Sequence, residues 1–325
     1  MTDTPKISRR NVLLGVGGAA VCTVAGGGIG YAMADKSDSA APAAAPDTTP
    51  KYRSRPDLRT LPDVTITTAA KGTTPGYIFL TPASGAGLWG PLIVDEQGSP
   101  VWFRKVPDPA TVAIDFKAQR YQNKPVLTWW EGTIGGTGGQ GVGQGEFVIA
   151  DTSYREITRV RAAGSEQADQ HDFVITPDGT ALFWIYDPIP YDLTALGGPA
   201  DGVLHDGVLQ EIDIRTGRRV FEWRARDHVG LDESYAPLPA GDSAHLPYDY
   251  FHANSVGLDA DGHLLVSARH TWGAYKIDRK SGAVIWRIGG KKSDLVVDAQ
   301  DPGEPGAVGG DRFGHAVRSF GPRTS

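Results

Sequence analysis

The chain has 325 residues, a formal net charge of −6, 42 glycines, 23 prolines, 8 tryptophans and 2 methionines. This length can bury a large core, and the many glycines suit short strands joined by tight turns. No lysine- and arginine-rich stripe is interleaved with aromatic residues, which excludes nucleic acid as a partner. Cys22 is the single cysteine, so the rest of the chain has no disulfide, thiolate nucleophile or cysteine-based metal site.

The first 34 residues have the pattern of a twin-arginine export signal. Arg9 and Arg10 precede an uncharged run, residues 12–34, which ends in a small-residue cleavage motif. The same run is long enough to remain in the bilayer as a transmembrane helix, although its many glycines weaken a helix. We therefore expect an exported protein, extracellular or in the cell envelope, that is either released or membrane-anchored. Residues 35–61 follow as an Ala/Pro-rich linker with too few apolar side chains to pack.

From residue 62 to 325, apolar strands alternate with turns that carry Asp and Gly. The second strand of each pair ends in tryptophan or another aromatic residue. Such hairpins, repeated at intervals of tens of residues, are typical of β-propeller blades, which bury their faces against neighbouring blades. The predicted fold class is therefore all-β, a β-propeller, with a large β-sandwich as the alternative. The copies of the hairpin are residues 92–103, 173–184, 209–223 and 275–286.

Two long insertions interrupt this pattern, at residues 132–145 and 230–248. Insertions of this length in a compact domain are often functional rims or lids. Trp129 and Trp130 stand directly before the first insertion. We predict that both belong to the core, with an aromatic pocket lined by one of them as the alternative.

One short stretch gathers chemistry-bearing side chains. His252 and Asn254 begin a strand, an Asp-Gly turn follows, and the next strand ends at Arg269 and His270. Pairing of the two strands would bring these four residues together. Two imidazoles, a carboxamide and a guanidinium can hold a tetrahedral anion such as sulfate or phosphate and donate hydrogen bonds to it. Other histidines are predicted to be structural: His205, His228 and His263.

These segments resemble bacterial arylsulfotransferases over roughly residues 75–318. The H-x-N motif at 252–254 and the S-x-R-H motif at 267–270 carry most of the resemblance, with support from residues 76–79, 129–132, 169–172 and 276–286. The resemblance implies a six-bladed propeller. The strands counted in this sequence correspond to about four to five blades. Family members continue through further strands beyond the position where this chain ends. An incomplete ring is therefore expected.

The resemblance also implies an activity. Family members transfer a sulfuryl group from a phenolic sulfate ester to a phenol, with no nucleotide donor and no cofactor, through a transient sulfohistidine. By similarity, His315 is the nucleophile, and His252 and His171 are catalytic helpers. Arg269, Asn254 and His270 are expected to bind the sulfate; Arg269 suits this role because its guanidinium recognises two oxygens at once. The expected partners are small molecules, an aryl sulfate donor and a phenolic acceptor.

Three alternatives stay open. The truncated propeller could be non-catalytic and bind ligands or proteins. The repeat also resembles the blades of quinone-cofactor dehydrogenases. A metal site formed by His171, His252 and His315 is a further option, although no ligand spacing of the usual kind supports it.

Overall fold

The computed structural model of the protein describes residues 61–62, 64–68, 71–83, 87–135, 141–241 and 246–295. The predicted export segment, nearly all of the predicted linker and His315 lie outside these residues and remain predictions. The chain divides into two compact units, Met1–Lys105 and Val106–Ser325. Within the described residues, no helix has the length and apolarity needed to cross a membrane.

The described part of the first unit holds one small antiparallel sheet with the order β1-β2-β3. Its strands are β1 (Ile78–Leu80), β2 (Leu92–Val94) and β3 (Pro100–Phe103). The side chains of Leu92, Val94 and Phe103 are buried together and form its core. The β2–β3 hairpin is the predicted repeat copy at residues 92–103.

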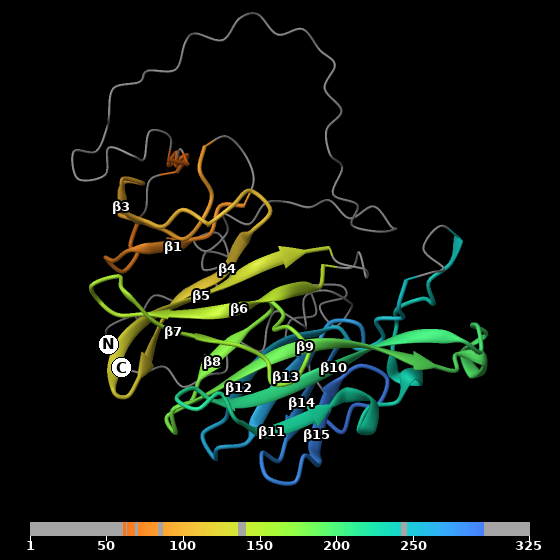
Figure 1. Cartoon of the computed structure of the whole chain (residues 1–325). Coiled ribbons are helices and arrows are strands. Elements are labelled where there is room, and N and C mark those ends of the chain that lie inside the picture. The colour runs from red at the N-terminus through yellow and green to blue at the C-terminus, as the bar shows by residue number, and fades with distance from the viewer. Residues whose placement is uncertain are drawn as a thin grey trace, which may run out of the picture. The chain divides into compact units, whose positions relative to one another are not determined.

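Three four-stranded antiparallel sheets make up the second unit, each built from four consecutive strands (Figure 1). Each sheet is therefore a meander, which is how a propeller blade is constructed. The first sheet contains β4 (Val112–Tyr121), β5 (Lys124–Ile134), β6 (Gly143–Ala150) and β7 (Glu156–Val160). The second contains β8 (Phe173–Ile175), β9 (Thr180–Tyr191), β10 (Gly202–Asp213) and β11 (Arg219–Arg224). The third contains β12 (Ala253–Leu258), β13 (Leu264–Ala268), β14 (Gly273–Ile277) and β15 (Val284–Gly289).

The first strands of these three sheets lie against one another. Gln119 of β4 donates from Nε2 to the carbonyl of Phe173 in β8, at 3.1 Å, and accepts from the amide of Ile175, at 2.9 Å. Asp172, directly before β8, accepts from the amide of Val256 in β12, at 3.0 Å. Successive meanders that meet through their first strands are successive blades of a β-propeller.

The prediction of an all-β propeller is therefore confirmed, and the β-sandwich alternative is wrong. The described residues contain four antiparallel sheets, at the lower end of the expected four to five blades. The six-bladed ring and its incompleteness stay predictions.

The turns at the outer edges of the blades have the Asp and Gly chemistry that the sequence predicted. In the β10–β11 turn, Asp213 Oδ1 accepts from the amide and the hydroxyl of Thr216, and Gly217 has a φ of 69°. In the β14–β15 turn, Asp278 Oδ1 accepts from the amide of Ser281, and Gly282 has a φ of 76°. Glycine is needed in both turns because a positive φ is unfavourable for residues with a Cβ.

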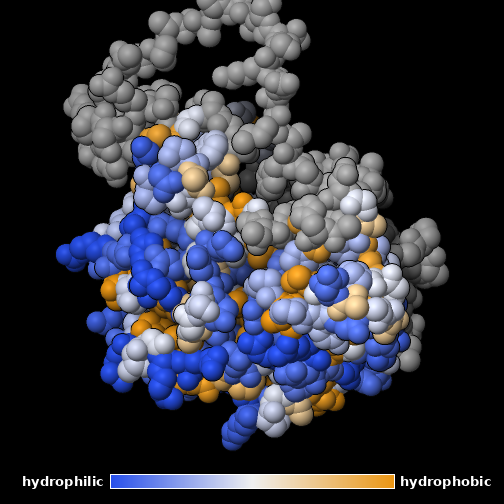
Figure 2. All heavy atoms as spheres, turned by 45° about the vertical axis from the view of Figure 1, so that its right-hand side comes forward, coloured by the Kyte–Doolittle hydropathy of each residue, from blue (hydrophilic) through white to orange (hydrophobic). Residues whose placement is uncertain are grey.

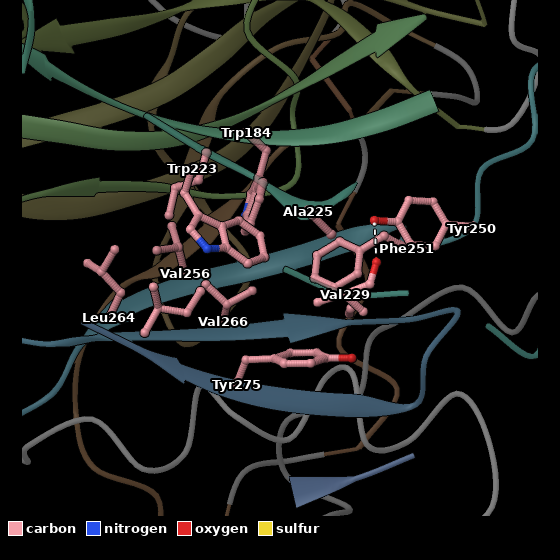
Figure 3. Close-up of a cluster of buried hydrophobic side chains, with 14 of the residues drawn as sticks. Trp184, Trp223, Ala225, Val229, Tyr250, Phe251, Val256, Leu264, Val266 and Tyr275 are labelled. Carbon is pink, nitrogen blue, oxygen red and sulfur yellow. Dashed lines mark hydrogen bonds between the residues drawn. The ribbon is translucent and has the colours of Figure 1, made fainter. Parts of the chain in front are cut away.

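The hydrophobic core lies between the sheets. Trp184 of β9 and Trp223 of β11 meet at 6.4 Å between ring centroids and pack towards Val256, Val266 and Tyr275 of the third sheet (Figure 3). The outer surface is largely hydrophilic, with hydrophobic residues in scattered small groups on the face that Figure 2 shows. The second unit is thus held together by sheet-on-sheet burial.

Trp129 and Trp130 of β5 are fully buried, which confirms the predicted core role. The Trp130 indole donates from Nε1 to the carbonyl of Ala168 at 2.9 Å. A side chain at Gly145 would collide with this indole and with the Glu131 carbonyl, which explains glycine in the β5–β6 hairpin. The alternative, that one of the two tryptophans lines an aromatic pocket, is not supported.

Of the three predicted repeat copies in the second unit, one differs from the other two in its place in the blade. The copies at 209–223 and 275–286 are the outer hairpins β10–β11 and β14–β15. The copy at 173–184 is instead an inner hairpin, β8–β9. A sequence pattern of strand, Asp-Gly turn and aromatic strand suits either place, because both kinds of hairpin supply a buried tryptophan to the core, Trp184 in β9 and Trp223 in β11.

Candidate active site

Two Asp–His pairs stand directly before the first strands of neighbouring blades. His171, two residues before β8, contacts Asp169: the distance from its Nδ1 to Asp169 Oδ1 is 2.5 Å, and its amide donates to the same oxygen at 2.9 Å. His252, directly before β12, pairs through Nδ1 with Asp249 Oδ2, and its amide donates to Asp249 Oδ1 at 3.1 Å. Each aspartate therefore fixes both the backbone and the ring of its histidine.

Buried backbone groups hold the first pair in place. Asp169 is fully buried, and its Oδ2 accepts from the amide of Gly143 at 2.7 Å. Its own amide donates to the carbonyl of Trp184 at 2.8 Å. The pair is thereby attached to β6 on one side and to β9 on the other.

The second pair depends on a strained residue. His252 has a φ of 47°, in the left-handed region that favours glycine, and its side chain is almost completely buried. Its carbonyl accepts from the amide of Arg269 at 2.8 Å. Strain of this kind costs about 1–3 kcal/mol and persists only where the surroundings impose it, which is common at functional sites.

Three imidazoles come together at this end of the blades. The ring centroids of His171 and His252 are 4.9 Å apart, and those of His252 and His270 are 4.8 Å apart. His270 Nδ1 contacts the carbonyl oxygen of Asp249, so all three rings have Nδ1 occupied by an oxygen acceptor. An imidazole that donates from Nδ1 keeps the lone pair of Nε2 for a reaction partner.

Tyr186 of β9 completes the wall behind these rings. Its ring centroid is 5.7 Å from that of His252 and 6.0 Å from that of His171. Its hydroxyl donates to the carbonyl of Ala253 at 2.8 Å, which fixes the ring. Burial raises the pKa of the Tyr186 phenol well above its usual range, so this group stays neutral.

Three titratable groups of the cluster have shifted pKa values. Burial lowers the pKa of His171, but the Asp169 carboxylate more than compensates, so the net pKa is raised. Burial lowers the pKa of His270 by more than the Asp249 carboxylate raises it. Burial likewise raises the pKa of Asp249, but the neighbouring His252 outweighs it and brings the pKa to about 2. His171 therefore keeps its proton to a higher pH than an ordinary histidine, and His270 loses its proton at a lower pH.

Arg269 and Asn254 are joined to this cluster through the backbone of the β12–β13 pair. Arg269 directly follows β13 and is attached to His252 through its amide, and its charge lowers the pKa of both His171 and His270. Asn254 is half-buried in β12, next to His252. The antiparallel pairing of β12 with β13 sets Ala253 opposite Ala268, and this brings the two ends of the motif together as expected.

The structure therefore brings together four of the six predicted site residues, His171, His252, Arg269 and His270. Asn254 lies two residues after His252 in β12, and His315 lies outside the described residues. His228 and His263 are elsewhere, as expected: His228 stacks on Trp223, and His263 Nδ1 is 3.6 Å from Asp278 in a turn. His205 differs from its prediction. It lies in β10 with its ring 6.0 Å from that of Tyr186, beside the cluster.

Sequence reasoning missed four residues of this site. Asp169 and Asp249 had a signal: each lies two or three residues before a predicted site histidine and begins a turn that leads into an inner strand. Tyr186 and His205 had none, because their place depends on the register of the long β9–β10 pair, in which His205 lies opposite Pro188 and Tyr186 opposite Gly207.

One group of side chains in the described residues has the composition of a metal site. Asp249, His252 and His270 each offer a ligand atom, and these atoms lie within 4.8 Å of one another. Two of them, Asp249 Oδ2 and His252 Nδ1, are already paired with each other. A cation would have to break that pair close to the charge of Arg269, so the arrangement suits an anion better than a metal.

Comparison with protein families shows the family of this chain. The model of the arylsulfotransferase (ASST) family matches residues 117–300, which include every described residue of the cluster. The chain belongs to the ASST family. This membership supports an enzyme of sulfotransferase type that acts on small aryl molecules.

Solved structures similar to this ASST-family chain are distant. A protein of unknown function from Bacteroides caccae is 11% identical, with a TM-score of 0.31, over 66% of this chain and 73% of that one. The Dos1 propeller is 10% identical, with a TM-score of 0.35, over 63% of this chain and 44% of its own. A europium-containing methanol dehydrogenase is 13% identical, with a TM-score of 0.37, over 69% of this chain and 41% of its own. This chain thus spans less than half of the last two. No curated protein matches it significantly.

Proposed function

We propose that this protein transfers a sulfuryl group from a phenolic sulfate ester to a phenolic acceptor through a transient sulfohistidine. The observation that carries the proposal is the cluster of His171, His252 and His270 beside Arg269, in which a carboxylate oxygen contacts Nδ1 of the first two rings and the Asp249 carbonyl contacts Nδ1 of the third. Family membership supports the same chemistry. We further propose, from the export signal in the sequence, that the protein acts outside the cytoplasm.

The sulfate group of the donor would bind at Arg269. Sulfuryl transfer resembles phosphoryl transfer, with a loose transition state whose charge lies on three equatorial oxygens. A guanidinium recognises two of these oxygens at once and stays charged at any relevant pH. The side chain of Asn254 can donate to a third. Such preorganised donors are typically worth about 10²–10³ in rate each.

The transfer takes two balanced steps. In the first, an imidazole nitrogen attacks sulfur, the N–S bond forms, the ester S–O bond breaks, and the phenolate leaves with a proton from a neighbouring imidazolium. In the second, the acceptor phenol gives its proton to that imidazole while its oxygen attacks sulfur and the N–S bond breaks. Resemblance to the family assigns the nucleophile to His315.

His171 suits the proton-transfer role. Burial lowers the pKa of its imidazolium, but Asp169 more than compensates, so the acid form persists to a higher pH than in an ordinary histidine, and its ring borders that of His252. His252, with its Nδ1 held by Asp249, keeps a fixed orientation and tautomer. The two pairs therefore offer an acid and a base in adjacent positions.

An aromatic pair beside the cluster suits the aryl group of the donor. Tyr235 and Trp272 stack at 3.9 Å between centroids, and both are partly exposed. The amide of Tyr235 donates to the carbonyl of His270 at 2.8 Å, and that of Trp272 to Arg269 at 3.3 Å. The pair is thus fixed to the sulfate-binding residues through the backbone. Trp272 also has a φ of 53°, a second strained residue at this site.

A transfer assay tests the proposal. Purified protein is incubated with para-nitrophenyl sulfate and phenol, and both nitrophenol release and phenyl sulfate formation are measured. The proposal predicts both, with strong loss in Arg269→Ala and little change in His263→Gln, a turn histidine outside the cluster. Absence of transfer from a protein whose circular dichroism shows an intact fold would contradict it.

A further inference from the structure

The 230–248 insertion borders a cavity of about 300 Å³ next to the Tyr235–Trp272 pair. Asp232 and Lys291 are the charged residues of its lining. Ser234 and Ala236, the two neighbours of Tyr235 in the chain, also line it, so the segment that carries Tyr235 forms one of its walls. The apolar side chains of the lining are those of Leu196, Leu231, Ala236 and Leu238.

Lys291 connects this cavity to the aromatic pair. Its Nζ lies over the ring of Tyr235, 4.8 Å from the centroid, and the same ring stacks on Trp272. The amide of Tyr235 donates to the carbonyl of His270 at 2.8 Å. A group bound in the cavity would therefore lie directly beside the aromatic pair to which the aryl group of the donor is assigned.

The ammonium of Lys291 is held in place by backbone carbonyls. It donates to the carbonyl of Asp232 at 3.0 Å and to that of Ser234 at 2.5 Å. An ammonium has three donors, so one N–H remains for a ligand. Among the described residues, no carboxylate forms an ion pair with Lys291.

The neighbouring charges balance one another without Lys291. Asp232 pairs with Lys292 at 3.0 Å. Glu233 is buried and lies 3.6 Å from Arg287 and 3.5 Å from Lys292. Two carboxylates thus face two cations, and Lys291 adds an uncompensated positive charge to the cavity. An anionic group is favoured there over a neutral or cationic one.

The proposed reaction requires donor and acceptor to use the same aryl position in turn. In an in-line transfer through a histidine, the acceptor reaches the sulfur from the face that the leaving phenolate has vacated. Recognition beside the Tyr235–Trp272 pair therefore acts on the aryl group of both substrates.

We propose that the cavity and Lys291 bind a short side chain of the aryl group that ends in a carboxylate. The apolar lining would contact the methylene groups of this side chain, and the remaining N–H of Lys291 would donate to the carboxylate. The preferred substrates are then phenols with an anionic side chain and their sulfate esters. This inference rests on the proposed sulfuryl transfer, and it adds the substrate class.

Two acceptors of the same shape test the selection: 3-(4-hydroxyphenyl)propanoate and the corresponding uncharged propanamide. With para-nitrophenyl sulfate as the donor, kcat/KM is expected to be about 5-fold higher for the propanoate, as for an exposed ion pair. Lys291→Met removes the charge but keeps most of the side chain, and it should bring this ratio near one. Lys280→Met, at an exposed turn at the opposite end of β15, should retain the ratio.

Filling the cavity tests its place separately from its charge. Leu238→Trp should lower kcat/KM for both acceptors relative to phenol, which has no side chain to place in the cavity. Unchanged values relative to phenol would overturn the assignment to this cavity. A ratio of propanoate to propanamide near one in the wild type, or an unchanged ratio in Lys291→Met, would overturn the role of Lys291.

Calorimetric titration of the propanoate in the absence of a donor decides the same point without turnover. Lys291→Met is expected to bind it about 5-fold more weakly than the wild type does, and equal affinity would overturn the inference even if no transfer occurs. Loss of transfer to every acceptor with this affinity difference intact would contradict the proposed reaction and support the binding site.

Discussion

The Asp249→Asn substitution is expected to disable His252 while leaving the fold intact. Asp249 is 2% exposed, and its two oxygens serve the same residue: Oδ1 accepts from the His252 amide at 3.1 Å, and Oδ2 pairs with Nδ1. Asparagine can keep the first bond, but its NH₂ group then faces Nδ1. The imidazole can satisfy this donor only by moving its proton to Nε2, so the lone pair needed for proton transfer is lost.

The size of the effect follows from the bond that is lost. A hydrogen bond to a charged group contributes about 1.5–3 kcal/mol, which corresponds to about 10- to 150-fold in kcat. The free energy of unfolding should fall by about 1–3 kcal/mol, because one buried polar contact is replaced by a poorer one.

Nitrophenol release under saturating donor measures kcat, and urea unfolding measures stability. Asp206→Asn is the matched control, since Asp206 is equally buried but pairs with Arg224 and Arg226 and with no histidine. A kcat of Asp249→Asn within about twofold of the wild type would refute the reasoning.

Three further predictions concern pH, charge and packing. The raised pKa of His171 keeps its acid form populated above the ordinary histidine range, so kcat should decline as pH rises through that raised pKa. Asp169→Asn should move this decline to lower pH, and an unmoved pH profile would contradict the role of the pair. Arg269→Lys should lower kcat/KM by about 10²-fold through loss of two-point sulfate recognition, whereas Arg155→Lys, at an exposed turn, should have no effect. Trp223→Ala should lower the free energy of unfolding by about 3–5 kcal/mol, measured in urea, because Trp223 is 1% exposed and donates to the Gly282 carbonyl at 3.0 Å. Trp286→Ala, at a half-buried position of β15, should cost clearly less; equal losses would contradict the packing described for the core.

Local sequence patterns were sufficient to predict the hairpins of the blades. The turns at Asp213–Gly217 and Asp278–Gly282 are specified by a short side chain that bonds the next amides and by a glycine with positive φ. Both requirements lie within five residues, so they can be recognised without knowledge of the rest of the chain. The proximity of His252 and His270 could be predicted in the same way, because a single hairpin connects them.

Contacts between blades could not be predicted in this way. His171 meets His252 only because the inner strands of two blades are adjacent, and family resemblance, not spacing, had indicated it as a site residue. His205 was predicted to be structural, because a lone histidine in a strand gives no sign of its neighbours. Its place beside Tyr186 depends on the length and register of β9 and β10, which the sequence pattern does not specify.

The proposed reaction passes the sulfuryl group through a covalent intermediate on His315. The most direct measurement incubates the protein with para-nitrophenyl sulfate without an acceptor, stops the reaction at alkaline pH, and maps the sulfuryl group by mass spectrometry of peptides. The account predicts one acid-labile sulfuryl group on His315 that disappears when phenol is added. An adduct on His252 would contradict the assigned nucleophile, and transfer to phenol without any protein-bound sulfuryl group would contradict the two-step mechanism.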